Sequence, residues 1–358
     1  MILSNKIKKI CVVVNSRANY ARIKSLLVEI NKSKKFKLIL VLGASATLYR
    51  FGRVDKVMRK DHFKIIDKLF SVVEGNDLIA MPKTTGLSII ELSNILKNNK
   101  PDLVVAIADR YENLSIAISA SYMNIPVAHI QGGETTGSID EKVRHAITKL
   151  SDIHFVSTKR AKDFVIRMGE SKSKVFLTGC PSIDLLKNID FNLPKNFFIK
   201  RGSGGIVYPN ENYILVIQHP VTTEFDNAEV QIEETIEAVK LFCKKTDYKV
   251  VWLWPNIDAG SDTFSKKIRI FQNTHPNYVR FVKNFTPEDY AKVMKNSKCV
   301  IGNSSSGIRE ASFLGVPSVN IGTRQSDRER GPNVRDVNYN RNEIYKSITQ
   351  QVNKKFKK

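Results

Sequence analysis

Residues 125–147 read IPVAHIQGGETTGSIDEKVRHAI, and this stretch contains the pattern that decides the fold. Residues 125–130 form a short apolar run typical of a buried strand, two glycines end it, and a helical pattern begins at about Asp140. Strand–loop–helix units of this kind build parallel α/β sheets. Ligands bind in the loops at the carboxyl ends of such strands, so the titratable side chains of this loop indicate a functional site. The alternative is a glycine-rich turn before an ordinary helix, with Asp140 and Glu141 complementing the helix dipole.

The same alternation of strands and helices continues along the whole chain. In the first half, strand-like runs lie at 9–14, 37–42, 102–107, 125–130, 153–157 and 174–178, and helical patterns at 18–31, 86–98, 112–123, 140–150 and 158–168. In the second half, strands are expected at 213–217, 249–254, 279–282, 299–301 and 318–321, and helices at 226–245, 263–273, 287–296, 305–314 and 341–353.

This alternation predicts an α/β protein with two Rossmann-like domains whose parallel sheets face a central cleft. The pattern lapses at 188–209, where asparagines, prolines and glycines gather, and we interpret this stretch as a linker. The domains are therefore expected at 1–187 and 210–340. The last helical pattern, within 341–358, is not followed by a predicted strand, so we expect it to pack back on the first domain and to end in a basic tail.

Composition limits the classes of function. The hydrophobic content of 42% is enough for two cores, but no apolar run approaches the roughly 20 residues that a membrane helix needs. The cysteines are scattered, which predicts free thiols, no metal site and a cytoplasmic location; they are Cys11, Cys180, Cys243 and Cys299. The first strand is not followed by the fingerprint GxGxxG, so we expect no nicotinamide and predict no cofactor.

The net charge of +22 can indicate nucleic-acid or membrane-surface binding. Here the lysines are spread along the chain, without an RNA-binding aromatic motif, a zinc finger or a recognisable helix-turn-helix. We therefore expect neither nucleic acid nor a membrane as a partner. A general positive field would instead attract an anionic small-molecule substrate.

A candidate diphosphate site follows the strand at 299–301. The tract GNSSSGIRE places Ser304, Ser305, Ser306 and Gly307 in a turn before a helix expected to begin at about Ser305. Backbone N–H groups and hydroxyls at such a turn suit a phosphate, although a plain serine N-cap uses the same residue type. Arg324, just past the next strand, is expected near the same anion.

Two further loops at strand ends in the second half carry polar side chains. His219, in the tract HPVTTE, could bind a phosphate or transfer a proton, or it could simply be fixed in a turn by Pro220. Asn256 and Asp258, in the tract WPNIDAGSD, suit a sugar or a ribose, but they could equally form Asx turns.

The first half supplies candidates for acid–base chemistry. Asp109 and Arg110 follow the strand at 102–107 and are expected beside the strand tip that carries His129 and Gln131, and Arg17 follows the first strand at the same edge. Carboxylates beside arginines suit proton transfer on a substrate with an anionic leaving group.

The helix expected at Asp140 carries two pairs of side chains that are four residues apart. Asp140 pairs with Arg144 and Glu141 with His145, so each pair can share a helix face. Glu134 adds a further carboxylate in the preceding loop. One of these pairs could merely stabilise the helix. We expect Arg144 and His145, together with His129, to contact the substrate.

Taken in order, these motifs resemble the hydrolysing UDP-N-acetylglucosamine 2-epimerases of sialic- and legionaminic-acid-type sugar biosynthesis. The resemblance covers nearly the whole chain, through Arg17, DRYE (109–112), the block at 129–152, GCPS (179–182), HPVTTE, WPNIDAGSD, GNSSSGIREA and GTRQ (322–325). It implies a GT-B-like fold and a nucleotide-sugar substrate, either UDP-N-acetylglucosamine or UDP-N,N'-diacetylbacillosamine. It also implies elimination of UDP through a 2-acetamidoglycal, addition of water to release the free 2-epimeric sugar, and a homodimer or homotetramer.

The resemblance also implies roles for individual residues. It assigns acid–base catalysis to Asp109 and Asp140, and nucleotide or phosphate binding to Arg17, Arg110, His219, Ser304, Ser305, Glu310 and Arg324. The chain departs from the family at Gln131, where relatives usually have an acidic residue. A glutamine cannot act as a carboxylate base, so either Glu134 or Asp140 takes this part, or Gln131 only positions the substrate.

Further departures lie close to the expected sugar site, at Asn19, at 43–46 and at Ile107. They suggest a subgroup with an altered substrate, such as a 4-amino-6-deoxy sugar, or a different nucleotide. The alternatives are a non-hydrolysing epimerase, whose GTRPE and HVEAGLRT-like tracts are absent, and a GT-B glycosyltransferase, which leaves the 129–152 block unexplained. A nucleic-acid-binding protein would explain the charge but not the clustered carboxylates.

Overall fold

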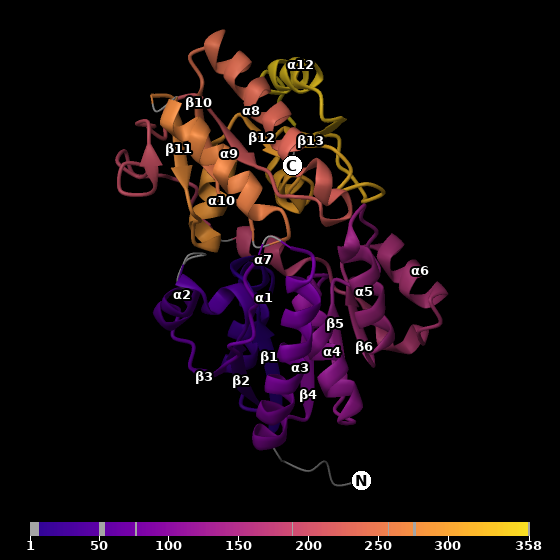
Figure 1. Ribbon diagram of the computed structural model, residues 1–358. Helices are drawn as coiled ribbons and strands as arrows, with labels where there is room; N and C mark the ends of the chain where they lie inside the picture. Colours follow the sequence, from indigo (N-terminus) through magenta and orange to yellow (C-terminus); the bar gives the residue numbers. More distant parts are fainter. Residues whose placement is uncertain are drawn as a thin grey trace. The chain divides into compact units, whose positions relative to one another are not determined.

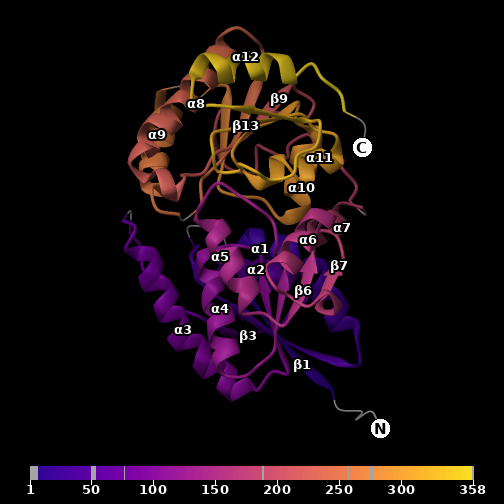
Figure 2. The ribbon, with the colours of Figure 1, turned by 90° about the vertical axis from the view of Figure 1, so that its right-hand side faces the viewer.

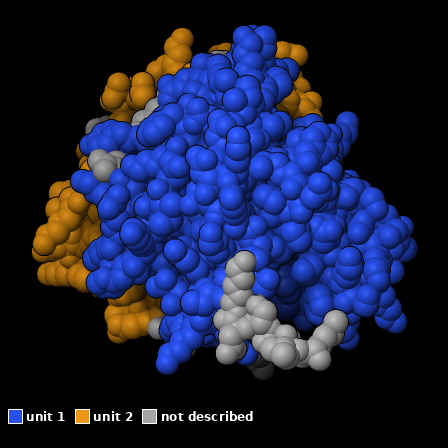
Figure 3. Space-filling model, turned by 90° about the horizontal axis from the view of Figure 1, so that it is seen from below, with its two compact units in different colours: residues 1–135, 139–187 blue, residues 136–138, 188–358 orange. Residues whose placement is uncertain are grey.

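The computed structural model describes residues 7–49, 54–75, 77–187, 189–256, 258–274 and 277–356. The chain forms two compact units (Figure 3). Unit 1 comprises Met1–Thr135 and Ile139–Lys187, and unit 2 comprises Thr136–Ser138 and Asn188–Lys358. The segment at 125–147 therefore begins in unit 1, enters unit 2 for three residues and returns to unit 1.

Unit 1 is built around a parallel sheet with the strand order β3-β2-β1-β4-β5-β6-β7. Its strands are β1 (Lys8–Val14), β2 (Phe36–Leu42), β3 (Ile65–Lys68), β4 (Leu103–Ile107), β5 (Val127–Ile130), β6 (Ile153–Val156) and β7 (Val175–Leu177). Its helices are α1 (Arg17–Lys32), α2 (Val54–Lys60), α3 (Ala80–Asn99), α4 (Tyr111–Tyr122), α5 (Ile139–Lys149), α6 (Lys159–Arg167) and α7 (Pro181–Leu186), with short 3₁₀ turns η1 (Ala44–Thr47) and η3 (Lys172–Lys174).

The central strand β1 is apolar throughout its buried part because helices cover both of its faces. Val12 and Val14 pack with α1 residues such as Leu27, whereas Cys11 and Val13 pack on the other side with residues of α3, α4 and α5. This division follows from the alternation of side chains along a strand. The three helices of the second face lie side by side (Figure 1, Figure 2).

Unit 2 contains a second seven-stranded sheet, with the order β14-β13-β12-β9-β10-β11-β8. Its strands are β8 (Ser203–Gly204), β9 (Tyr213–Ile217), β10 (Lys249–Leu253), β11 (Val279–Val282), β12 (Cys299–Gly302), β13 (Ser318–Ile321) and β14 (Val334–Val337). Its helices are α8 (Ala228–Lys244), α9 (Ser261–Thr274), α10 (Pro287–Asn296), α11 (Glu310–Leu314) and α12 (Arg341–Gln351), with 3₁₀ turns η4 (Thr222–Asn227) and η5 (Ser305–Gly307).

The two sheets confirm the predicted α/β class, with one correction. The second sheet is mixed rather than wholly parallel, because β8 pairs antiparallel with β11. A two-residue strand that contains a glycine leaves no pattern in the sequence, and neither β3 nor β14 was expected. None of the helices in the described part of the chain is long and apolar enough to cross a membrane.

The stretch interpreted as a linker is in fact folded onto unit 2. Phe198 is fully buried and makes an edge contact with the ring of Tyr213, at 5.4 Å between ring centroids. The guanidinium of Arg280 donates hydrogen bonds to the carbonyls of Phe198 and Arg201, at 3.1 and 2.8 Å between nitrogen and oxygen. A buried arginine from β11 therefore satisfies the backbone of this irregular segment.

The C-terminal helix also differs from the expectation. α12 packs against α8, β13 and β14 of unit 2, and its Ile344 and Ile348 are part of that unit's core (Figure 1, Figure 2). Gln351 Nε2 donates to the carbonyls of Ser318 and Asn333, at 3.0 and 2.9 Å. The helical period in the sequence identified the apolar side of this helix but not the surface that covers it.

Candidate functional site

The loops that follow β4 and β5 lie next to each other at the carboxyl edge of the unit 1 sheet. The two strands pair in parallel, with Ile107 opposite Ile130, so the residues that follow them, including Asp109 and Gln131, lie at the same edge of the sheet. His129 joins the two loops, because its Nε2 lies 2.9 Å from the Ala108 carbonyl and its Nδ1 lies 3.1 Å from Thr148 Oγ1. Burial lowers the pKa of His129 to about 4, so its ring is neutral at pH 7.

This geometry changes the interpretation of His129. Both ring nitrogens have partners inside the fold, and the side chain is fully buried. The sequence suggested a substrate contact, whereas in the structure His129 contacts the Ala108 carbonyl and holds the Asp109 loop in place.

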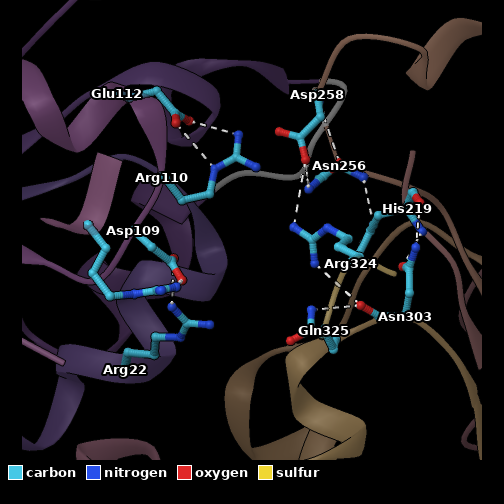
Figure 4. Close-up of polar contacts among 11 residues, drawn as sticks. Arg22, Asp109, Arg110, Glu112, His219, Asn256, Asp258, Asn303, Arg324 and Gln325 are labelled. Carbon is cyan, nitrogen blue, oxygen red and sulfur yellow. Dashed lines mark hydrogen bonds and ion pairs between the residues drawn. The ribbon is translucent and has the colours of Figure 1, made fainter. Parts of the chain in front are cut away.

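Asp109 is the carboxylate around which the unit 1 site is arranged. It is 6% exposed, it forms an ion pair with Arg144 Nη2, and Arg22 Nη1 lies 3.4 Å from its Oδ1. Figure 4 shows Arg22 reaching Asp109 from α1. Arg144 is fully buried and also donates through Nη1 to the Glu134 carbonyl, at 2.5 Å. Two guanidinium groups therefore balance one buried carboxylate.

The predicted pair of Asp140 and Arg144 is not the arrangement that forms. Arg144 turns from α5 toward Asp109, which is 35 residues away in sequence. Asp140 lies in the first turn of α5 and is partly exposed. Glu134 is buried, and it is its carbonyl, rather than its carboxylate, that binds Arg144.

The second predicted pair on α5 is present but loose. His145 Nε2 lies 3.9 Å from Glu141 Oε1, and the ring stacks on Phe164 at 5.0 Å between centroids. Burial and the neighbouring Arg144 lower the pKa of His145, so the neutral form dominates at pH 7.

Two further arginines of unit 1 lie at the amino ends of helices. Arg110 immediately precedes α4 and makes two hydrogen bonds with Glu112, from Nε at 3.2 Å and from Nη2 at 3.0 Å, as Figure 4 shows. Arg17 is the first residue of α1, whose N-cap is Ser16. Burial lowers the pKa of Arg17 to about 10, so it remains charged at pH 7.

The candidate site of unit 2 is formed by loops after four neighbouring strands, β13, β12, β9 and β10. Asn303 joins two of these loops: its Oδ1 accepts from the His219 N–H at 2.8 Å, and its Nδ2 donates to the His219 carbonyl at 2.8 Å. His219 Nδ1 accepts from the Asn256 N–H at 3.2 Å. The neutral ring therefore carries its proton on Nε2, which suits donation to an anion.

Arg324 lies against the same group of loops (Figure 4). Its Nη1 donates to the Asn303 carbonyl at 3.4 Å, and its Nη2 lies 3.8 Å from Asp258 Oδ2. Asn256 Nδ2 also donates to Asp258 Oδ2, at 2.6 Å. The structure thus brings four of the predicted residues together, namely His219, Asn256, Asp258 and Arg324.

The serine-rich turn lies between β12 and α11. Ser304 Oγ accepts from the Ser306 N–H at 3.4 Å and lies 2.9 Å from Ser306 Oγ, which is also 2.5 Å from Tyr290 OH. Burial raises the pKa of the Tyr290 phenol, so it stays protonated. Gly302 has φ 125°, and a Cβ there would overlap the Ile217 carbonyl oxygen.

The expectation of a single helix at 305–314 needs correction. The segment forms a three-residue 3₁₀ turn, η5, followed by the five-residue helix α11. Ser306 and Gly307 are buried, whereas Ser304, Ser305 and Glu310 are partly exposed. So short a helix has little dipole, which leaves N–H groups, hydroxyls and Arg324 as the groups near this turn that suit an anion.

The loop after β13 also receives the three residues of the 125–147 segment that belong to unit 2. The Gly137 N–H donates to the Arg324 carbonyl at 3.3 Å, and a Cβ on Gly137 would overlap the Thr323 carbonyl oxygen. A residue without a side chain is therefore required where this segment touches the Arg324 loop.

Sequence reasoning missed several residues of these two clusters. Arg22 and Tyr290 make contacts described by the structure but have no local signal in the sequence, whereas Asn303 and Gln325 lie in quoted tracts and were given no role there. Asn303 alone could have been singled out, because an amide at a strand end beside a serine turn often fixes loops.

Comparison with known proteins gives consistent matches over almost the full length. The family model described as UDP-N-acetylglucosamine 2-epimerase matches residues 28–358. The UDP-N,N'-diacetylbacillosamine 2-epimerase (hydrolyzing) of Legionella pneumophila is 32% identical over 348 residues, which is 97% of this chain and 90% of that protein. The GDP/UDP-N,N'-diacetylbacillosamine 2-epimerase (hydrolyzing) of Campylobacter jejuni is 30% identical over 359 residues, covering 98% and 89%.

A solved structure supports the fold at lower sequence identity. The Methanocaldococcus jannaschii UDP-GlcNAc 2-epimerase, in complex with UDP-GlcNAc and UDP, has a TM-score of 0.79 at 18% identity and covers 97% of this chain and 93% of that chain. The fold, the order of the motifs and the matches in sequence agree: the chain belongs to the UDP-N-acetylglucosamine 2-epimerase family.

Proposed function

We propose that this protein is a hydrolysing 2-epimerase of a UDP-N-acetylamino sugar. The observation that supports this most directly is the buried Asp109 carboxylate held between Arg144 and Arg22, at a strand end where ligands bind. The relatives named as hydrolysing enzymes match over 97% and 98% of the chain.

The reaction divides into two steps, each of which conserves atoms and charge. In the first, a base removes the proton from C2, the C1–O bond breaks, and its electron pair leaves with UDP, which gives a 2-acetamidoglycal. In the second, water adds its hydroxyl to C1, and C2 receives a proton on the face opposite to the one from which the first proton was removed. The products are UDP and the free 2-epimeric sugar.

We assign the proton transfers to unit 1. Asp109 is one proton-transfer group, and Asp140 or Glu134 is the other, because Gln131 has no ionisable proton. The buried arginine pair holds Asp109 in one orientation, which general acid–base catalysis requires. Arg17 and Arg110 lie at the same edge of the sheet and supply positive charge.

We assign the nucleoside diphosphate to the loops of unit 2. His219, with its proton on Nε2, and Arg324 would bind phosphate oxygens together with Ser304 and Ser305. Charge developing on the departing UDP is then stabilised by groups already held by Asn303. Asn256, Asp258 and Glu310 offer acceptors for sugar or ribose hydroxyls.

We propose UDP-N,N'-diacetylbacillosamine as the preferred substrate, with UDP-N-acetylglucosamine as the weaker one. Relatives named for the first sugar are 32% and 30% identical, and the Neisseria meningitidis protein named UDP-N-acetylglucosamine 2-epimerase is 29% identical. Neutral side chains at Asn19 and Gln131, together with small residues at 44–46, favour a modified sugar. The product would enter biosynthesis of a sialic- or legionaminic-acid-type sugar in the cytoplasm.

The test is incubation with each UDP-sugar in D₂O, followed by NMR. We expect release of UDP and of a free sugar that carries deuterium at C2, faster from UDP-N,N'-diacetylbacillosamine. Retention of UDP on an epimerised product would instead identify a non-hydrolysing enzyme. If neither sugar releases UDP or exchanges its C2 proton, the proposal fails.

We also propose that the protein is a homodimer or a homotetramer. Light scattering coupled to size-exclusion chromatography measures this directly. A mass equal to the 40.5 kDa of one chain would contradict the proposal.

A further inference from the structure

Gln131 occupies an unusual position for a glutamine. Its φ angle is 64°, in the left-handed region, and its side chain is fully buried. Its N–H donates to the Phe155 carbonyl of β6 at 2.8 Å, which fixes the backbone at the end of β5. A strained and buried polar residue at a strand end is typical of a functional position.

The nitrogen end of the Gln131 carboxamide has a defined partner. Nε2 donates to the sulfur of Cys180 at 2.9 Å, and this sulfur lies 3.0 Å from Ser182 Oγ. Cys180 and Ser182 belong to the turn that precedes and begins α7, after β7, so the contact joins residues 49 positions apart. In this arrangement the thiol accepts from Nε2 and can donate to Ser182 Oγ, so both of its hydrogen-bonding roles are used.

The oxygen end has no hydrogen-bond partner among the described residues. Gln131 Oε1 is buried and unpaired, although buried polar atoms are paired in the great majority of cases. A carboxamide oxygen can only accept, and because Nε2 faces Cys180, the end of the side chain without a partner is this acceptor. The carboxamide therefore lacks one hydrogen-bond donor among the described residues.

The location of this acceptor indicates which donor it takes. Gln131 follows β5 and Asp109 follows the adjacent β4, and His129 ties the two loops together. Under the proposed function, on which this inference rests, Asp109 works at C2 of the sugar. The substituent on C2 is an acetamido group, whose N–H is a neutral donor suited to a carboxamide oxygen.

We infer that Gln131 Oε1 accepts a hydrogen bond from the C2 acetamido N–H of the substrate, and that Cys180 and Ser182 are positioning residues that orient the carboxamide. The chain thereby recognises a 2-acetamido sugar by hydrogen bonding at the reacting carbon. This role needs no proton transfer from Gln131, which agrees with its chemistry.

The first experiment compares binding of UDP, UDP-N-acetylglucosamine and UDP-glucose by calorimetry. Both proteins compared carry Asp109→Asn, which we expect to prevent turnover, and one also carries Gln131→Leu. We expect Gln131→Leu to weaken UDP-N-acetylglucosamine about tenfold and to change UDP and UDP-glucose less than about twofold. Equal weakening of all three ligands, or no weakening of any, would overturn the inference.

The second experiment tests whether Cys180 acts through Gln131. We expect Cys180→Ala to lower kcat/KM about fivefold, and the double variant with Gln131→Leu to be no worse than Gln131→Leu alone. Cys180→Ser should restore most of the activity, because a hydroxyl can also accept from Nε2. Additive losses, or no rescue by serine, would contradict the positioning role.

Controls separate this inference from the proposed function. Cys243→Ala, on α8 of unit 2, removes a thiol elsewhere and should leave kcat/KM unchanged. Thermal unfolding of each variant checks that it is folded. If the wild type releases no UDP from either sugar, the proposed reaction fails, while the binding comparison still tests the acetamido contact.

Discussion

Replacing Arg144 by methionine tests the central arrangement of unit 1. Arg144 is fully buried and connects α5 to Asp109 and to the Glu134 carbonyl. Methionine has a similar length but neither charge nor donors. Of the two guanidinium groups beside Asp109, Arg144→Met removes one and leaves that of Arg22, whose Nη1 lies 3.4 Å from Asp109 Oδ1.

The size of the effect follows from the burial of the pair. Removing one partner of a buried ion pair costs about 3–5 kcal/mol, and loss of the charge-assisted hydrogen bond to the Glu134 carbonyl adds about 1.5–3 kcal/mol. The contact with Arg22 offsets part of this cost. We expect the free energy of unfolding of unit 1 to fall by about 4 kcal/mol, and turnover to fall at least about a hundredfold.

The assay must report on unit 1 alone, because proteins with more than one domain do not always unfold in a single transition. Both tryptophans, Trp252 and Trp254, lie in unit 2, so tryptophan fluorescence reports on the wrong unit. Hydrogen exchange in urea, measured by mass spectrometry on peptides from β4 and β5, follows unit 1 directly.

The matched control removes both charges. Arg144→Met combined with Asp109→Asn leaves no uncompensated carboxylate, so we expect it to recover about half of the lost stability. A loss below about 1 kcal/mol in the single variant, or no recovery in the double variant, would refute the reasoning.

Three further predictions concern proton transfer, pH and backbone geometry. Asp109→Asn should abolish turnover while leaving UDP binding, measured by calorimetry, within about threefold of wild type; loss of UDP binding would instead place Asp109 in the nucleotide site. Burial depresses the folded-state pKa of His129 from 6.5 to about 4, so in this pH range the unfolded chain binds a proton that the folded chain does not. The free energy of unfolding of unit 1 should therefore fall by about 3 kcal/mol as the pH falls from 6.5 to 4. Hydrogen exchange should show a smaller loss for His129→Gln, and the same dependence of this free energy on pH in the wild type and the variant would disprove the contribution. Gly302→Ala should destabilise unit 2 by about 2–4 kcal/mol in tryptophan-monitored urea unfolding, because its Cβ would overlap the Ile217 carbonyl; an unchanged midpoint would contradict this.

Much of the fold is evident from the sequence because its signals are local. Apolar runs such as the one at β9 alternate with helical periods, and this alone predicts two α/β sheets. The turn residues at strand ends identified the loops that form both candidate clusters. The ordered motifs then indicated the family, which the comparisons confirmed.

The partners of these residues were decided only by the tertiary structure. Spacing along α5 suggested Asp140 for Arg144, whereas the sheet order brings Asp109 to it from the adjacent β4 loop. The same holds for Gln131 and Cys180, which are joined because β5, β6 and β7 are neighbours.

The physical reason is the range of the interactions involved. Helical and strand periods depend on residues within a few positions, so the sequence displays them directly. Strand order, the surface under α12 and the ion pair of Asp109 depend on burial shared between distant segments. The sequence determined which chemical groups are present at the strand ends, and the packing of the sheets decided which of them meet.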